Sequence, residues 1–188
     1  MVKPFELISS RHVLDSAIFR MREDKAQHPK TGAVAPYIVL ETSDWVTVVP
    51  ETPDGHVVMV KQWRHGSRTI ELEFPAGLVD PGETPDLAGP RELQEETGFT
   101  SSSWETLGSM YPNPAFQQNR SHVLWARDVM PTSSQALDAG EDIDVVMLTR
   151  NELRDCFVSG ALRNAISQVA LFMWLERQNQ VVWPGPTP

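Results

Sequence analysis

An acidic run spaced like one face of a helix is the feature that most constrains this 188-residue chain. Between Gly77 and Phe99 the sequence reads GLVDPGETPDLAGPRELQEETGF. Glu92, Glu95 and Glu96 stand at i, i+3 and i+4, so a helix would place their Cβ atoms about 5–6 Å apart. Carboxylates at that spacing repel one another, and a hard divalent cation would turn the repulsion into attraction. Mg²⁺ takes oxygen ligands and phosphates together, so we predict a magnesium site on this helix.

The predicted helix carries its own start and stop signals. Thr84 is a good N-cap, and Pro85 suits the first helical position. Gly98 is expected to take the left-handed conformation that ends the helix. Pro90 lies inside the pattern and has no N–H to donate, so the sequence predicts either a kink or a helix that begins near Gly89.

This run resembles the signature of the Nudix hydrolases at every fixed position. The matching residues are Gly77, then after five residues Glu83, then after seven residues Arg91-Glu92-Leu93, then Glu95-Glu96 and Gly98-Phe99. The alternative is a solvated helix face that happens to be acidic. Such a face would not need the glycines and the arginine in register, so the resemblance is the better interpretation.

The resemblance implies a set of metal ligands and a supporting set around them. The expected ligands of Mg²⁺, with Mn²⁺ as a substitute, are Glu92, Glu95, Glu96 and the backbone carbonyl of Ala76. Structural roles in the motif would fall to Gly77, Glu83, Arg91 and Gly98. Arg91 is expected to pair with a motif glutamate and orient it, and Gly77 to allow close approach of the loop to the helix.

Hydrolysis of a diphosphate also calls for a general base. In the branch of the family that this chain resembles, a glutamate in the loop before the last strand acts as base or extra ligand, and Glu141 aligns best with it. The expected catalytic residues are therefore Glu141, Glu95 and Glu96. An acidic turn that merely precedes a strand explains Glu141 about equally well.

Two further segments resemble ADP-ribose and nucleotide-sugar pyrophosphatases, namely VKQWRHG around Arg64 and ELEFPAG at 71–77. Arg64 is expected to contact the diphosphate, since its guanidinium is a fork of donors that stays charged. It could instead be a surface charge. Glu73 is expected to reach the terminal ribose or a metal, or else to be a solvated partner of Arg68. Pro114 lies one position short of a proline associated with ADP-ribose hydrolases.

Aromatic side chains could stack on the base of a nucleotide. The candidates for substrate contacts of this kind are Tyr37, Trp63 and Phe116. The predicted function is Mg²⁺-dependent hydrolysis of a nucleoside diphosphate sugar, either ADP-ribose or a GDP- or ADP-sugar. The alternatives are a catalytically silent nucleotide-binding module and a Nudix enzyme acting on another nucleoside diphosphate derivative.

The composition of the chain argues against some classes of binding partner. The formal net charge of −9 argues against unaided binding to nucleic acid or to an anionic membrane. The chain has one cysteine, Cys156, so no intramolecular disulfide can form. There is no long apolar run of the kind found in secretory signals or membrane spans, and a cytoplasmic location is the expectation.

The order of predicted elements indicates an α/β fold. Strands are expected within 5–22, 37–41, 45–50, 56–63, 104–110, 121–126 and 143–148, with a hairpin turn at Pro53-Asp54-Gly55 and a polar loop at 23–33. Helices are expected after the capping pair Thr149 and Glu152 and over 166–178.

The expected architecture is a Nudix-type α/β/α sandwich with a mixed sheet, plus a small N-terminal antiparallel β subdomain. We assign 1–42 to an N-terminal strand segment exchanged in a homodimer, 43–183 to the hydrolase domain and 184–188 to a disordered tail.

Overall fold

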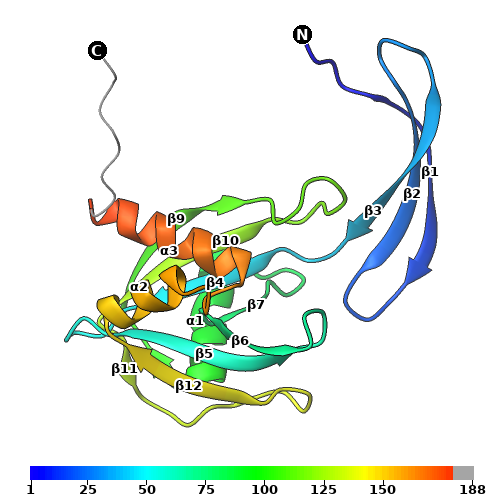
Figure 1. Cartoon of the computed structure of the whole chain (residues 1–188). Helices are drawn as coiled ribbons and strands as arrows, with labels where there is room; N and C mark the ends of the chain where they lie inside the picture. The colour runs from blue at the N-terminus through cyan, green and yellow to red at the C-terminus, as the bar shows by residue number, and fades with distance from the viewer. Residues whose placement is uncertain (180–188) are drawn as a thin grey trace, which may run out of the picture. The chain divides into compact units, whose positions relative to one another are not determined.

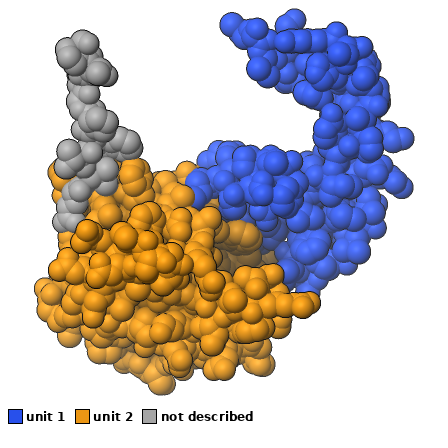
Figure 2. All heavy atoms as spheres, viewed as in Figure 1, with its two compact units in different colours: residues 1–44, 110–120 blue, residues 45–109, 121–188 orange. Residues whose placement is uncertain are grey.

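A computed structural model of the chain describes residues 1–179 (Figure 1). The described chain forms two compact units: one contains 1–44 and 110–120, and the other contains 45–109 and 121–179 (Figure 2). The tail predicted at 184–188 lies outside the described residues. None of the helices within 1–179 has the length and apolar character needed to cross a membrane.

The first unit is built on an antiparallel sheet in the order β1 (Glu6–Asp15), β2 (Arg20–Gln27) and β3 (Val34–Glu41). This confirms the N-terminal antiparallel sheet. The polar loop predicted at 23–33 is wrong in its first half, since residues 23–27 pair with both neighbouring strands. Their charged side chains form ion pairs with neighbouring strands: Arg11 of β1 donates to the Glu23 carboxylate at 3.1 Å. Polarity therefore marked a partly buried strand with charged side chains rather than a loop.

The second unit holds the remaining strands. They are β4 (Trp45–Pro50), β5 (Val57–Arg64), β6 (Thr69–Glu73), β7 (Ala76–Leu78), β8 (Phe99–Thr100), β9 (Ser103–Met110), β10 (Ser121–Arg127), β11 (Met130–Pro131) and β12 (Ile143–Leu148). One sheet runs β7-β4-β10-β9 and another β12-β5-β6, with β11 beside β8. β4 is parallel to β10 and antiparallel to β7, so the first of these sheets is mixed, as predicted.

Three helices complete this unit: α1 (Pro85–Thr97), α2 (Arg150–Val158) and α3 (Ala165–Arg177). Leu93 of α1 packs in one core cluster with Val48 of β4 and Val58 of β5. α3 lies against β4 as well (Figure 1). All residues of β4 from Val46 to Pro50 are buried, as expected for a strand that is covered on both faces. The α/β sandwich is confirmed.

The hairpin turn predicted between β4 and β5 is confirmed, but the two strands do not pair with each other beyond it. A tight turn does form, with Thr52 N–H donating to the His56 carbonyl at 2.9 Å. Only the pair Glu51 and Val57 continues the ladder, because the two strands then enter different sheets. A turn signal specifies a reversal of the chain but not the partners of the strands beyond it.

The helix prediction holds at its ends, and of the two outcomes predicted for Pro90 the start near Gly89 is wrong. Pro85 occupies the first turn, and Gly98 takes φ 74° as predicted, although Thr84 makes no side-chain cap bond. The helix runs on through Pro90 and does not begin near Gly89. Packing on both sides of Pro90 explains this, because Ala88 and Leu93 are fully buried and anchor the helix before and after it.

The two C-terminal helices are confirmed. Thr149 and Glu152 form the predicted capping box, with Thr149 N–H donating to the Glu152 carboxylate at 2.8 Å. Along α3 the buried residues are Ser167, Ala170, Leu171 and Trp174. Val169, expected on the apolar face, is exposed.

Replacing Gly98 by alanine should destabilise the fold more than the same change at Gly55. Both residues have positive φ, 74° and 83°. That conformation costs an L-residue roughly 1–2 kcal/mol. Nothing lies within 4 Å of a Cβ built on Gly55, whereas one on Gly98 would overlap the carbonyl oxygen of Ser133. Urea unfolding at constant m-value measures the difference, and equal losses for the two variants would contradict the packing described here.

Candidate active site

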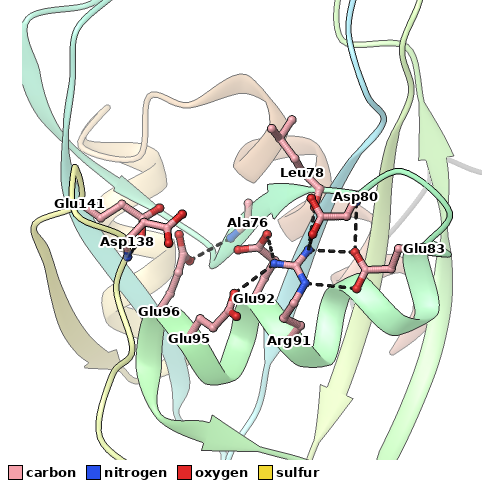
Figure 3. A network of polar contacts seen from close by, with 10 residues as sticks. All are labelled: Ala76, Leu78, Asp80, Glu83, Arg91, Glu92, Glu95, Glu96, Asp138 and Glu141. Atoms are coloured by element: carbon pink, nitrogen blue, oxygen red, sulfur yellow. Dashed lines mark hydrogen bonds and ion pairs between the residues drawn. The ribbon is translucent and has the colours of Figure 1, made fainter. Parts of the chain in front are cut away.

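Arg91 is the centre of the acidic face of α1 (Figure 3). Its guanidinium donates to both carboxylate oxygens of Glu83, at 3.1 and 2.9 Å. The same group reaches Glu92 at 2.8 Å and Glu95 at 3.0 Å. A further bond of 2.9 Å to the Leu78 carbonyl joins the helix to β7. The Arg91 guanidinium thus joins the helix to the loop before it and holds two of the three clustered glutamates.

Glu96 differs from its neighbours because it is buried, with 3% of its surface exposed. Its carboxylate accepts the backbone N–H of Ala76 at 3.0 Å. Burial, together with the charges of Glu92 and Glu141, raises the pKa of Glu96 to about 8, against the opposing effect of the Ala76 N–H. Burial also raises the pKa of Glu92, against the effect of Arg91. The site therefore carries more negative charge than its own cations neutralise.

Gly77 makes room for the Glu92 carboxylate. Gly77 lies on β7 opposite Val46 of β4. A Cβ built on it would overlap all three terminal atoms of the Glu92 side chain. The glycine is needed here for close approach rather than for an unusual φ.

Glu141 lies beside Glu96 in the loop that precedes β12 (Figure 3). Its carboxylate accepts the backbone N–H of Asp138 at 3.0 Å. Its charge raises the pKa of Glu92 and of Glu96. The structure therefore brings Glu141 to the face of the motif glutamates, which is where a base or an extra ligand would have to lie.

Arg64 also faces this cluster, and it is held by Glu73. The guanidinium donates to Glu73 through Nε at 3.0 Å and through Nη2 at 2.6 Å. Hydrogen bonding to Glu73 raises the pKa of Arg64 despite burial, and the charges of Glu96 and Glu141 act in the same direction. Glu73 is 2% exposed, so it is not a solvated partner of Arg68.

The residues predicted to contact the base of the substrate do not all lie in the same unit. Trp63 is exposed on β5, next to Arg64, with its ring edge-on to His65. Tyr37, Pro114 and Phe116 belong to the first unit, where Tyr37 meets the ring of Phe5 edge-on at 5.8 Å. The structure gathers the predicted ligands, Glu141, Arg64 and Glu73 in the second unit and leaves these three residues in the first.

The donor set fits a hard cation by its chemistry. Glu92, Glu95 and Glu96 offer only oxygen ligands, as Mg²⁺ and Mn²⁺ prefer. In the described chain no three acidic, histidine or cysteine side chains are already gathered tightly enough to hold a metal ion. Arg91 is bonded to Glu92 and Glu95, and burial raises the pKa of Glu96, so a bound cation would favour the ionised form of that carboxyl.

One residue near the site escaped the sequence analysis. The side-chain amide of Gln135 donates to the backbone carbonyls of Glu96 and Ile143. Gln135 lies in the polar stretch between β11 and β12, which has no periodicity and matches no motif. No signal in the single sequence could have singled it out.

Comparison with known proteins shows the family. The model of the NUDIX domain matches residues 43–168, and the chain belongs to the Nudix family. It is 37% identical over 123 residues to the ADP-ribose pyrophosphatase of Mycobacterium tuberculosis, a match that covers 65% of this chain and 59% of that protein. The chain thus spans about three-fifths of the length of that relative.

Two further relatives match over more of their length. The ADP compounds hydrolase NudE of Escherichia coli is 30% identical over 139 residues, which cover 72% of this chain and 74% of that protein. A crystal structure of an ADP compounds hydrolase superposes with a TM-score of 0.83 at 25% identity, over 96% of this chain and 99% of that one. The fold match therefore includes both units.

Replacing Gly77 by alanine should weaken Mg²⁺ binding without unfolding the protein. The added Cβ displaces the end of a flexible side chain, Glu92, so stability should change little. The affinity for Mg²⁺, measured by titration calorimetry, should fall about tenfold or more, as when the support of a metal ligand is lost. Gly66→Ala is the control, since nothing lies within 4 Å of a Cβ built there. Unchanged affinity in the Gly77 variant would argue against Glu92 as a ligand.

Proposed function

We propose that the protein hydrolyses the diphosphate bond of a nucleoside diphosphate sugar, ADP-ribose or a GDP- or ADP-sugar, to a nucleoside monophosphate and a sugar phosphate. The observation that carries the proposal is that the carboxylates of Glu92, Glu95, Glu96 and Glu141 lie at one face of α1. The guanidinium of Arg64 is close enough to feel the charges of Glu96 and Glu141. The names of the relatives from M. tuberculosis and E. coli point to the same substrate class.

Each group has a role in this reaction. Glu92, Glu95, Glu96 and the Ala76 carbonyl would hold Mg²⁺, which when bound neutralises phosphate charge and lowers the pKa of a coordinated water. Arg64, fixed by Glu73, orients the diphosphate. Glu141 accepts the proton of the attacking water. The water oxygen forms a bond to one phosphorus, and the bridging oxygen leaves with the other phosphate.

The base of the substrate would be recognised by aromatic side chains. We propose Trp63, Tyr37 and Phe116 as stacking partners for the base, because an aromatic ring stacks on any base without reading its edges. Pro114 would shape the loop that carries Phe116. Within that loop Phe116 N–H donates to the Asn113 carbonyl at 3.2 Å, and the Phe116 carbonyl accepts from Leu40 N–H at 2.7 Å.

Incubation with Mg²⁺ and a substrate panel tests the function. The panel contains ADP-ribose, an ADP-hexose, GDP-mannose and 8-oxo-dGTP, with nucleoside monophosphate release followed by chromatography. Diphosphate sugars should be cleaved and 8-oxo-dGTP should not. Glu96→Gln should lower kcat by about a thousandfold, the scale of losing an electrostatic group essential to the transition state. Asp155→Asn, an exposed change on α2, is the control.

Two outcomes would contradict the proposal. Binding of ADP-ribose without turnover would show a nucleotide-binding module instead of an enzyme. Full activity of the Glu96→Gln variant would remove Glu96 from the ligand set.

We also infer that two copies of the chain associate through the N-terminal sheet. Large apolar residues are exposed on two of the three strands, β1 and β3: Leu7, Ile8, Val13, Leu14, Val34 and Ile38. Every residue of β1 is exposed. A three-stranded sheet needs a covered apolar face for stability, and exposed patches of this kind mark interfaces. A second copy presents the same surface and so supplies a matching partner.

Replacing Leu7 by glutamate should shift this dimer to monomer. Light scattering coupled to size exclusion should give twice the chain mass for the wild type and a lower mass for the variant. Val158→Glu, an equally exposed apolar site at the end of α2, should leave the dimer intact. A monomeric wild type at micromolar concentration would end the inference.

A further inference from the structure

The loop that carries Glu141 is docked on the C-terminal end of α1. Thr132 N–H donates to the Gly98 carbonyl, and Ala136 N–H donates to the Glu95 carbonyl, each at 2.9 Å. The last carbonyls of a helix have no donor within the helix. These contacts therefore satisfy groups that would otherwise need water, and they do so on the residues that bear the motif carboxylates.

Gln135 makes the most specific of these contacts. Its Nε2 lies 2.6 Å from the carbonyl oxygen of Glu96 and 3.1 Å from that of Ile143. A side-chain amide carries two hydrogens, so one nitrogen can donate to both carbonyls. Glu96 lies in the last turn of α1, and Ile143 is the first residue of β12. A single amide therefore joins the end of the motif helix to the start of the strand.

Glu141 lies inside the segment that this amide closes. Its backbone N–H donates to the Asp138 carbonyl, and its carboxylate accepts the Asp138 N–H, both at 3.0 Å. The acidic turn is thus rigid in itself. Its position relative to Glu96 depends on the bonds at its base, and the strongest of these ends on Glu96 itself.

We propose that Gln135 is a positioning residue that sets the place of the Glu141 carboxylate relative to the motif glutamates. This role rests on the proposed function, in which Glu141 takes the proton of the attacking water. Catalytic groups must be held within about 0.5 Å of their productive position, so a loop that shifts slightly loses rate before it loses structure. Gln135 acts through Glu141 and does not itself touch the substrate.

The surroundings of Gln135 allow a role in positioning Glu141 to be distinguished from a role in stabilising the fold. Gln135 is an exposed residue, and none of the core clusters includes it. Water can replace its hydrogen bonds, so its loss should cost the fold little. The Ser133 side chain, two residues earlier, only accepts a 3.5 Å contact from Gln94. Ser133→Ala is therefore a matched control on the same segment.

The test replaces Gln135 by methionine, which has similar length and no donor. With the diphosphate sugar that the wild type cleaves, kcat should fall about tenfold to a hundredfold, the usual effect of removing an outer-shell partner. KM should stay within about twofold, and Ser133→Ala should match the wild type. In a double-mutant cycle, Gln135→Met added to Glu141→Gln should lower kcat no further, because the residue being positioned is already lost.

Hydrogen exchange supplies a readout that does not depend on activity. The Ala136 amide should exchange faster in Gln135→Met than in the wild type, and the Leu93 amide should not change. Unchanged exchange at Ala136, a full kcat, or additive losses in the cycle would each overturn the proposal. A wild-type protein that cleaves no diphosphate sugar would instead overturn the proposed function, and with it any catalytic effect of Gln135. The exchange result would then show only that Gln135 holds the loop against α1.

Discussion

The arrangement depends first on the contact of one guanidinium with three glutamates. Arg91 binds Glu83, Glu92 and Glu95 and reaches the Leu78 carbonyl, so it joins α1 to the segment before it. Hydrogen bonding to Glu83 raises the pKa of Arg91 and lowers that of Glu83. This cation offsets much of the repulsion on the helix face, and without it the glutamates could not be held in one place.

Arg91 does not complete the neutralisation. Glu96 is buried with only a backbone N–H beside it, and burial raises its pKa to about 8. Arg64 faces the cluster, but its guanidinium is bonded to Glu73. The protein thus supplies two guanidinium groups, those of Arg91 and Arg64, for the four carboxylates of the cluster, and both guanidinium groups are already paired. A buried charge without a partner is costly, which is why we propose that this face binds a further cation together with an anionic substrate.

The features that the sequence predicted well are those encoded within one or two turns of chain. The acidic face of α1, the glycine that ends it and the capping box of α2 each depend on residues no more than a few positions apart. Two features that depend on distant partners were not predicted. The turn at Gly55 was visible, but the sheets that β4 and β5 join were not. The charged residues of β2 looked like a loop because the strands that pair with them lie elsewhere in the sequence.

The same distinction divides the candidate site. The kinds of residue that would do the chemistry can be identified from spacing alone, since Glu92, Glu95 and Glu96 are on one helix. Their orientation is set by contacts made across the fold: Ala76 N–H to Glu96, Glu73 to Arg64, and Gln135 to the Glu96 carbonyl. The last joins residues 39 positions apart through a glutamine in a polar loop. Such a donor needs only reach and one amide, so it leaves no pattern in a single sequence, although it joins the motif helix to the loop that carries Glu141.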